Sequence, residues 1–448
     1  MDSQYGGTSF SSRGASQHAA QGASQLAAPS QPDPREHAHQ DSQEGKSFPR
    51  VGKGKSFRWG GRRKTVREWL WEGVVNPSVG YGICAAALWP SPMPVTSRSG
   101  FQVLGSYSWQ VNGKTSYKVP GSAPVWQQGI QLPIQLQKDC VTHPRRASSG
   151  PVAQHPFEPL FEATRTMSPS FRFDDVDIVV SRNSLRRLLD FCGHGYRWGF
   201  RLELLMVHNT LFIERCEMHP EFLTGQGGSR GFGHNFERAF TKFPSGENNN
   251  AGYHRCLRYH IGDLNCAVQF EVDARFGEPE TTKIDAEAED VGLSLARLTL
   301  AETKGGGGVS KESSLAPQSA VIEAKTLLAD RDWDRDLPQL WFGRVPWLMI
   351  GRHDAGLFTS VDVVDTGPRL AEWEEDSQPQ LRKLATLLTQ LRQAVTMFGG
   401  RNCAAIHQPG GLSGPVIYVC ESKLGRRALP DDFIQHAWAP AKGATGEI

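Results

Sequence analysis

The chain of 448 residues lacks several features that mark common classes of protein. Its eight cysteines are scattered singly, with no CxxC pair, which disfavours a zinc knuckle or a disulfide framework and indicates a reduced, intracellular protein. It has no apolar run of about 18 residues, so nothing in it is expected to span a membrane. Residues 1–45 are rich in Ser, Gln, Ala, Gly and His and lack the apolar core of a signal peptide. The P-loop motif is also missing.

Charge is nearly balanced over the whole chain but unevenly placed. The formal net charge of +2 does not by itself indicate a nucleic-acid-binding protein. However, the basic residues from Arg50 to Arg67 have no acidic residue among them. Such a run is typical of a contact with RNA backbone, of a nuclear address or of a solvated tail, and the sequence leaves all three open. We expect a nuclear protein, with a cytoplasmic location also open.

Composition divides the chain into a polar tail and an organised part. Residues 1–60 have low complexity and are expected to be disordered. Residues 61–150 form a basic and extended segment to which the sequence assigns no fold. A catalytic domain is expected over residues 151–440, with its organised part beginning near Pro156. Within it, residues 275–318 are acidic and then glycine-rich, which is typical of a flexible insertion.

Strands and helices alternate in this domain, which predicts a mixed α/β fold with a mixed β-sheet core flanked by helices. The leucines of residues 380–398 recur at helical spacing and are expected to pack in the core. Expected strands span residues 176–180, 200–207, 210–215, 255–259, 266–273, 321–325 and 347–352. Expected helices span residues 65–71, 184–191, 339–342 and 380–398, and another begins near His234.

Two short acidic motifs lie about 50 residues apart, each at the end of an apolar run. Glu271 and Asp273 should share one face of a strand because side chains alternate with period two, and the same holds for Glu323 and Lys325. Each motif alone is more typical of a solvated strand edge or a salt bridge. Together they predict strands that bring carboxylates and a lysine to one place, where they could hold a divalent metal against a phosphodiester.

Ligand chemistry suggests a role for each candidate residue. Glu237, in a helix that follows Gly233, suits direct ligation of Mg²⁺ or Mn²⁺ together with Asp273 and Glu323. Glu271 is a candidate for orienting the attacking water. Lys325 and Gln339 are candidates for contacting the scissile phosphate and stabilising its negative charge.

The order of these motifs is similar to that of the PD-(D/E)xK nuclease core. The series Arg182, Gly233-x-x-x-Glu237, Glu271-Val272-Asp273, Glu323-Ala324-Lys325 and Gln339 also resembles that of the decapping exoribonuclease (DXO) family, over about residues 172–398. The chain looks like a divergent, fungal-type member. The resemblance implies removal of a cap, NAD cap or triphosphate from RNA 5′ ends, with 5′→3′ degradation in some members. It also implies an RNA-backbone contact for Arg182 and a 5′→3′ exoribonuclease as partner.

Other interpretations stay open at this point. The main alternative is a catalytically inactive protein that binds RNA ends or partners an exonuclease, and a weaker one is a DNA-directed nuclease on the same core. Aromatic and basic residues near the expected cleft are candidates for stacking on single-stranded RNA, with ordinary strand packing as the alternative. They are Tyr253, His254, Arg255, Arg258, Tyr259, Trp341 and Arg344.

Overall fold

The computed structural model describes most of the chain from residue 65 onward, and these residues belong to a unit that spans Arg62–Ile448. The expected disordered tail and nearly all of the expected insertion, from residue 278 to residue 315, lie outside the described residues. The described ranges are 65–111, 115–139, 155–193, 198–216, 231–245, 247, 250–277, 316–328, 331–409 and 414–438.

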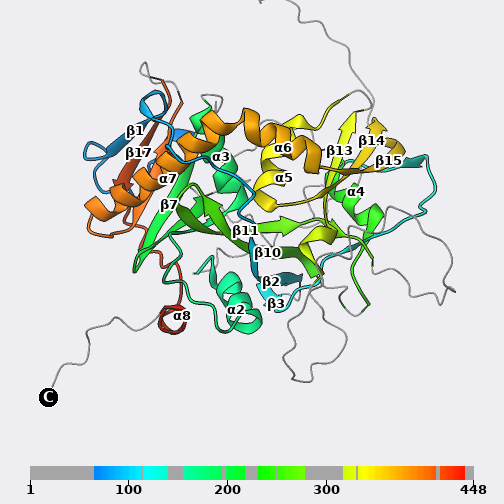
Figure 1. The fold of residues 1–448 in the computed structure, drawn as a ribbon, viewed down its shortest axis with the longest axis horizontal. Helices are drawn as coiled ribbons and strands as arrows, with labels where there is room; N and C mark the ends of the chain where they lie inside the picture. The colour runs from blue at the N-terminus through cyan, green and yellow to red at the C-terminus, as the bar shows by residue number, and fades with distance from the viewer. Residues whose placement is uncertain are drawn as a thin grey trace, which may run out of the picture. The chain divides into compact units, whose positions relative to one another are not determined.

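Two mixed β-sheets form the framework of this unit, and helices flank them, as the sequence predicted (Figure 1). In the larger sheet β6 runs parallel to β8 and β11, and the other neighbours are antiparallel. Its strand order is β1 (Tyr81–Cys84), β17 (Val416–Glu421), β16 (Cys403–His407), β7 (Phe200–Val207), β8 (Thr210–Cys216), β6 (Ile178–Ser181), β11 (Leu264–Val272), β10 (Asn250–Ile261), β2 (Gln102–Val111) and β3 (Thr115–Lys118).

The smaller sheet contains the second acidic motif. Its central pair, β13 and β14, is parallel, and β12 pairs antiparallel with β13. Its strand order is β5 (Ile134–Gln135), β15 (Leu357–Asp365), β14 (Trp347–Asp354), β13 (Val321–Leu328), β12 (Ala274–Arg275), β4 (Val125–Trp126) and β9 (Thr241–Lys242).

Helices cover both faces of the larger sheet. The side chains of β6 alternate between two apolar clusters, since Ile178 and Val180 face one and Val179 faces the other. The first cluster contains residues of α3 (Arg182–Cys192), α5 (Leu337–Gly343) and α7 (Gln378–Met397). The second contains residues of α2 (Glu158–Met167) and α8 (Asp431–Ala437). The remaining helices are α1 (Val66–Leu70), α4 (Gly233–Phe240) and α6 (Gly367–Asp376).

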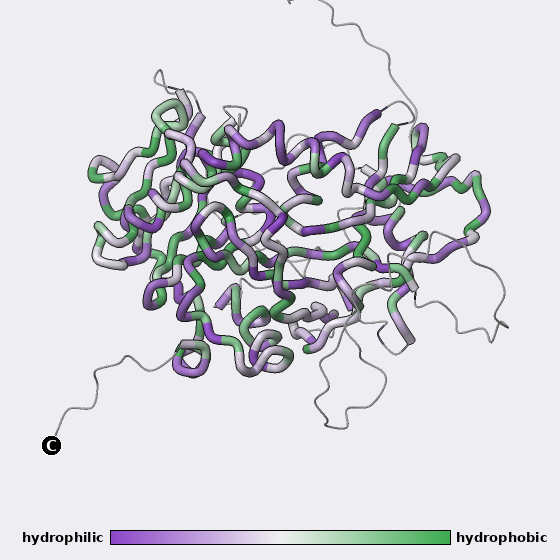
Figure 2. Tube along the Cα trace, viewed as in Figure 1, coloured by the Kyte–Doolittle hydropathy of each residue, from purple (hydrophilic) through white to green (hydrophobic). Residues whose placement is uncertain are grey.

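Hydrophobic periodicity predicted the most regular of these elements correctly. The leucines of α7 are fully buried, and β7 and β8 form the expected antiparallel hairpin. Figure 2 shows the hydrophobic stretches that run along the inner strands of the larger sheet. None of the helices in the described part of the chain is long and apolar enough to cross a membrane.

The organised fold begins well before Pro156, and the expected start there was wrong. Strands β1 to β5, all before residue 136, supply both sheets, and β2 pairs with β10 over most of its length. Strand β2 was not predicted because its buried positions include the polar residues Ser106 and Ser108, which break the apolar alternation of a strand. Their hydroxyl groups bond within the protein, to Met167 and to the backbone of Ser122, so burial costs them little.

The chain passes from the larger sheet to the smaller one at a single residue. Strand β11 ends at Val272 and β12 begins at Ala274, so Asp273 lies at the junction of the two sheets. The strand was expected to continue through Asp273. Because of this break, the first acidic motif is divided between a residue of the larger sheet and a residue between the sheets.

Candidate active site

The two acidic motifs meet at the junction of the sheets. Ala274 pairs with Ile322, which brings Asp273 beside the following residues of β13. The Ala324 backbone N–H donates to Asp273 Oδ2 at 2.9 Å, and Lys325 Nζ lies 3.9 Å from the same oxygen. The sequence-based expectation that separate strands bring these groups together agrees with this arrangement.

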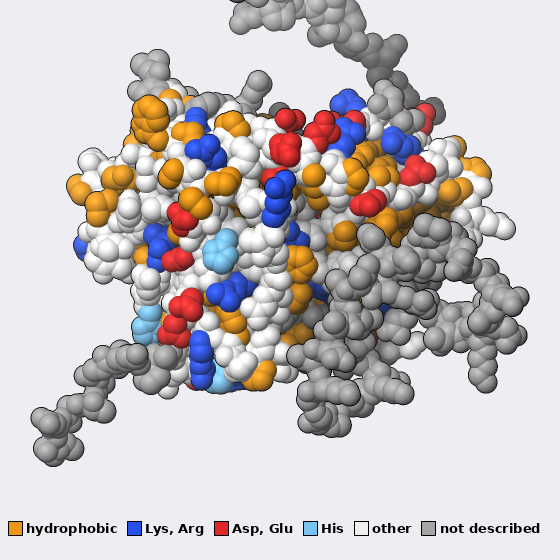
Figure 3. All heavy atoms as spheres, in the orientation of Figure 1, with side chains coloured by type: hydrophobic (Ala, Val, Ile, Leu, Met, Phe, Trp, Pro, Cys, Tyr) orange, Lys and Arg blue, Asp and Glu red, His pale blue; other side chains and the backbone are white. Residues whose placement is uncertain are grey.

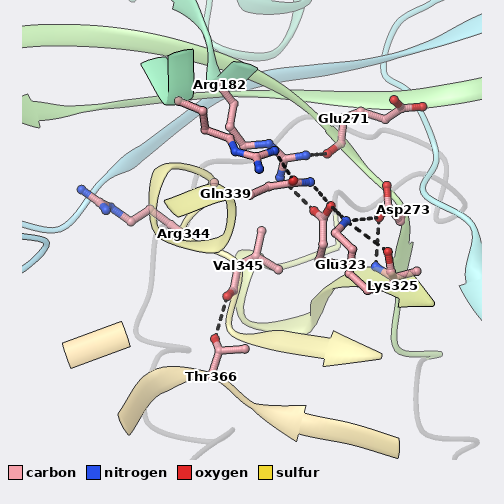
Figure 4. A network of polar contacts seen from close by, with 12 residues as sticks. Arg182, Glu271, Asp273, Glu323, Lys325, Gln339, Arg344, Val345 and Thr366 are labelled. Carbon is pink, nitrogen blue, oxygen red and sulfur yellow. Dashed lines mark hydrogen bonds and ion pairs between the residues drawn. The ribbon is translucent and has the colours of Figure 1, made fainter. Parts of the chain in front are cut away.

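Glu323 is the centre of the polar network drawn in Figure 4. Only 1% of its side chain is exposed, and Arg182 Nη1 donates to its Oε2 at 2.9 Å. Lys325 Nζ and Gln339 Nε2 both donate to its Oε1. Both carboxylate oxygens therefore have charged or polar donors, as a buried carboxylate requires.

Electrostatics separate the two buried carboxyl groups. Burial favours the neutral form of Glu323, but Arg182 and Lys325 outweigh it and lower the pKa of Glu323 to about 2. Burial, together with the charges of Glu323 and Glu237, raises the pKa of Asp273 well above its ordinary value. Burial acts to lower the pKa of Lys325, but Glu323 and Asp273 raise it overall. The two carboxyl groups therefore differ in how readily they ionise: Arg182 and Lys325 favour the ionised form of Glu323, whereas burial and neighbouring carboxylates oppose ionisation of Asp273.

Arg182 lies in the interior of the site. It is the first residue of α3, which follows β6 directly, and the Ser181 hydroxyl caps this helix by accepting from the Ser184 N–H at 3.2 Å. Only 5% of Arg182 is exposed. Its Nη2 donates to the Glu271 backbone carbonyl at 3.2 Å, so it joins the larger sheet to Glu323 of the smaller one. In this position Arg182 holds the site together.

Glu271 and Glu237 lie further from this centre. Figure 4 shows the Glu271 carboxylate turned away from Asp273, Glu323 and Lys325, so the expectation that Glu271 and Asp273 share a strand face was wrong. The physical reason is the break in the strand at Asp273. Glu237 lies on α4, its side chain is 35% exposed, and its charge is among those that raise the pKa of Asp273.

Two charged residues near the site were missed at the sequence level. Arg186 lies one turn after Arg182 on α3 and donates through Nη1 to Gln339 Oε1. Asp336, which directly precedes α5, is 6% exposed, and its charge acts on Lys325 and Arg186. The spacing of Arg182 and Arg186 by four residues was the only signal in the sequence that pointed to a shared helix face.

Most of the candidate RNA-stacking residues are part of the core. Tyr253, Tyr259 and Trp341 are at most 2% exposed, so of the two alternatives that the sequence left open, packing in the core is the one that the structure shows. Arg344 lies between two of these rings, with its guanidinium 4.2 Å from the Tyr259 centroid and 4.1 Å from the Trp341 centroid. On the face in Figure 3, the described acidic and basic side chains are interspersed.

The donor set has the chemistry of a divalent-metal site. Carboxylates are the preferred ligands of hard cations, and the mutual repulsion that raises the pKa of Asp273 would be relieved by a cation. Among the described residues, however, no three such side chains already surround a common metal position. Glu323 would have to exchange at least part of its contact with Lys325 or Gln339 for a metal ion.

Comparison with known proteins establishes a family and a fold. A family model described as "Domain of unknown function (DUF8563)" matches residues 82–438, and the chain belongs to this family. No curated protein sequence matches it significantly. The fold is that of Rai1 proteins, members of the decapping exoribonuclease family, as the motif order suggested.

Three solved structures illustrate this likeness. Scheffersomyces stipitis Rai1 in complex with (3′-NADP)⁺ and calcium ion has a TM-score of 0.55 and 12% identity, covering 80% of this chain and 98% of that one. Candida albicans Rai1 in complex with pU5 and Mn²⁺ has a TM-score of 0.54 and 14% identity, covering 80% and 99%. A further structure of S. stipitis Rai1 has a TM-score of 0.50 and 14% identity, covering 77% and 97%.

Proposed function

We propose that this protein is a metal-dependent hydrolase that acts on RNA 5′ ends. The observation that carries the proposal is the buried cluster of Asp273, Glu323 and Lys325 at the sheet junction, with Arg182 and Gln339 bonded to Glu323. The Rai1 structures with the same fold contain pU5 with Mn²⁺, or (3′-NADP)⁺ with calcium. RNA or a nucleotide-capped 5′ end is therefore the substrate class that we assign to this cluster.

Glu237, Asp273 and Glu323 would hold the divalent ion, Mg²⁺ or Mn²⁺. When bound, such an ion polarises the phosphate and offsets the negative charge that develops on it. Asp273 would act as a ligand in its ionised form, and a bound cation would favour that form.

The other residues act on the substrate or on these ligands. Lys325 and Gln339 would donate to a non-bridging phosphate oxygen, from the same groups that contact Glu323 here. Arg182 keeps Glu323 ionised and in position. Glu271 is exposed and turned away from the cluster, so its side chain would have to turn toward Asp273 to accept a proton from the attacking water. The preferred 5′ end and the exoribonuclease partner stay predictions.

One observation favours a second candidate function, a non-hydrolytic protein that binds RNA ends. Both oxygens of Glu323 are engaged by Arg182, Lys325 and Gln339, an arrangement that neutralises the carboxylate without any metal. A site that keeps this arrangement with RNA bound would hold a 5′ phosphate without cleaving it. The two functions differ in turnover, and one assay separates them.

The test incubates the full chain with matched RNAs whose 5′ ends carry a monophosphate, a triphosphate, a methylated or unmethylated cap, or NAD. Each reaction contains Mg²⁺, Mn²⁺ or EDTA, and products are resolved by chromatography. We expect metal-dependent release of an end group or of nucleotides, lost in Asp273→Asn. RNA binding without metal-dependent turnover on any substrate would rule out the hydrolase and favour the second function.

A further inference from the structure

Gln339 lies between two charged groups of opposite hydrogen-bonding character. Arg186 Nη1 donates to its side-chain carbonyl oxygen Oε1, and its amide nitrogen Nε2 donates to Glu323 Oε1. Gln339 is 9% exposed, so water has little access to these bonds. Figure 4 shows its side chain directed at Glu323.

This arrangement permits only one orientation of the amide group. A guanidinium group only donates hydrogen bonds, and an ionised carboxylate only accepts them. If the amide of Gln339 were reversed, its NH₂ group would face Arg186 and its oxygen would face Glu323, so both contacts would be lost. Arg186 therefore determines which end of the amide is presented to Glu323.

Arg186 interacts electrostatically with several charged neighbours. Asp336, Glu323 and Asp190 attract its guanidinium group, and Arg182, one helical turn earlier, repels it. Arg182 is itself bonded to Glu323 and to the Glu271 carbonyl, and Arg186 is bonded to Gln339. The same helix face thus delivers one arginine to Glu323 and the other to Gln339.

We propose that Arg186 is a positioning residue that orients the Gln339 amide so that its NH₂ group is available to a substrate phosphate. No motif of the sequence assigns a role to Arg186. The proposal rests on the proposed hydrolase function, because it gives the oriented NH₂ group a task in turnover. Arg186 itself acts through Gln339 and leaves the substrate untouched.

A double-mutant cycle tests this role through turnover. Arg186→Met and Gln339→Met should each lower kcat roughly ten- to hundredfold, the value of one hydrogen bond to a charged group, with a smaller change in KM. The double variant should be no slower than Gln339→Met, because Arg186 has no other route to the substrate. Arg186→Lys, which keeps a charged donor, should recover part of the loss. Arg187→Met is the matched control, since Arg187 takes no part in the Gln339–Glu323 contacts.

Two kinetic results would overturn the proposal. Additive losses in the double variant would mean that Arg186 contacts the substrate or acts independently of Gln339. A wild-type kcat in Arg186→Met would mean that the Gln339 amide keeps its orientation without Arg186.

A crystal structure of Arg186→Met gives a readout that does not depend on activity. The Gln339 side chain should leave its contact with Glu323 or adopt more than one conformation, and a single unchanged conformation would contradict the proposal. If the wild-type protein proves inactive on every RNA, the proposed function fails, and this structural readout still decides whether Arg186 orients Gln339.

Discussion

Replacing Arg182 by Met should destabilise the protein strongly, because it leaves Glu323 as a buried carboxylate without its guanidinium partner. The side chains of this ion pair are only 6% and 1% exposed, and the Nη1–Oε2 distance is 2.9 Å. Breaking a buried pair from one side costs about 3–5 kcal/mol. Lys325 and Gln339 still contact the other oxygen of Glu323, so we expect the lower end, about 3 kcal/mol.

The assay is urea unfolding of the full chain in EDTA, followed by tryptophan fluorescence and circular dichroism. Comparison requires equal m-values, so that the same transition is measured in each variant. The double variant Arg182→Met/Glu323→Gln should be less destabilised than the sum of the single variants, because glutamine removes the orphaned charge. Arg187→Met, on the same helix, should stay within about 0.5 kcal/mol of the wild type.

The dependence on pH follows from the lowered pKa of Glu323, about 2 in the folded protein against an ordinary value of 4.5. A carboxyl group whose pKa is lower in the folded than in the unfolded protein stabilises the fold at pH values above its unfolded-state pKa. This stabilisation is lost as the pH falls toward its folded-state pKa. The difference in the free energy of unfolding between the wild type and Arg182→Met should therefore have its largest value above pH 4.5 and become smaller as the pH falls below it. A difference below about 0.5 kcal/mol at neutral pH would refute the assigned role of Arg182.

Three further predictions concern the surroundings of the site. Asp273→Asn should be at least as stable as the wild type in EDTA at neutral pH, since burial and nearby carboxylates oppose its ionisation, and Mn²⁺ should raise the melting temperature of the wild type alone. Gly351→Ala should destabilise the fold by about 1–3 kcal/mol and weaken the stabilisation by Mn²⁺, because the new Cβ would lie 2.3 Å from Phe236, on the helix that carries Glu237. Melting curves equal to those of the wild type would contradict this. Glu374→Gln should be less stable than the wild type at neutral pH and approach it below pH 4.5. Burial acts to raise the pKa of Glu374, but hydrogen bonds from neighbouring groups lower it overall. A pH-independent difference in the free energy of unfolding in urea would argue against this.

Sequence reasoning succeeded where the signal is local. The helical spacing of leucines predicted α7, and alternation along the chain predicted that Glu323 and Lys325 share a face, since their side chains bond to each other. It failed for β2, whose buried serines are satisfied by distant groups that no local pattern shows. It left the roles of Tyr259 and Trp341 undecided, because an aromatic residue near a motif has the same local pattern whether it faces the core or the solvent.

The sequence by itself determined which chemical groups are available and how near neighbours along the chain are related, because the backbone periods of 2.0 and 3.6 residues are local properties. Only the tertiary structure decided that the strand breaks at Asp273, that Glu271 turns away, and that Arg182 and Arg186 bond to Glu323 and Gln339. These contacts join residues more than 140 positions apart. The partners, burial and pKa values of these residues depend on how two sheets and three helices pack, and the local periodicity of the sequence carries no information on that packing.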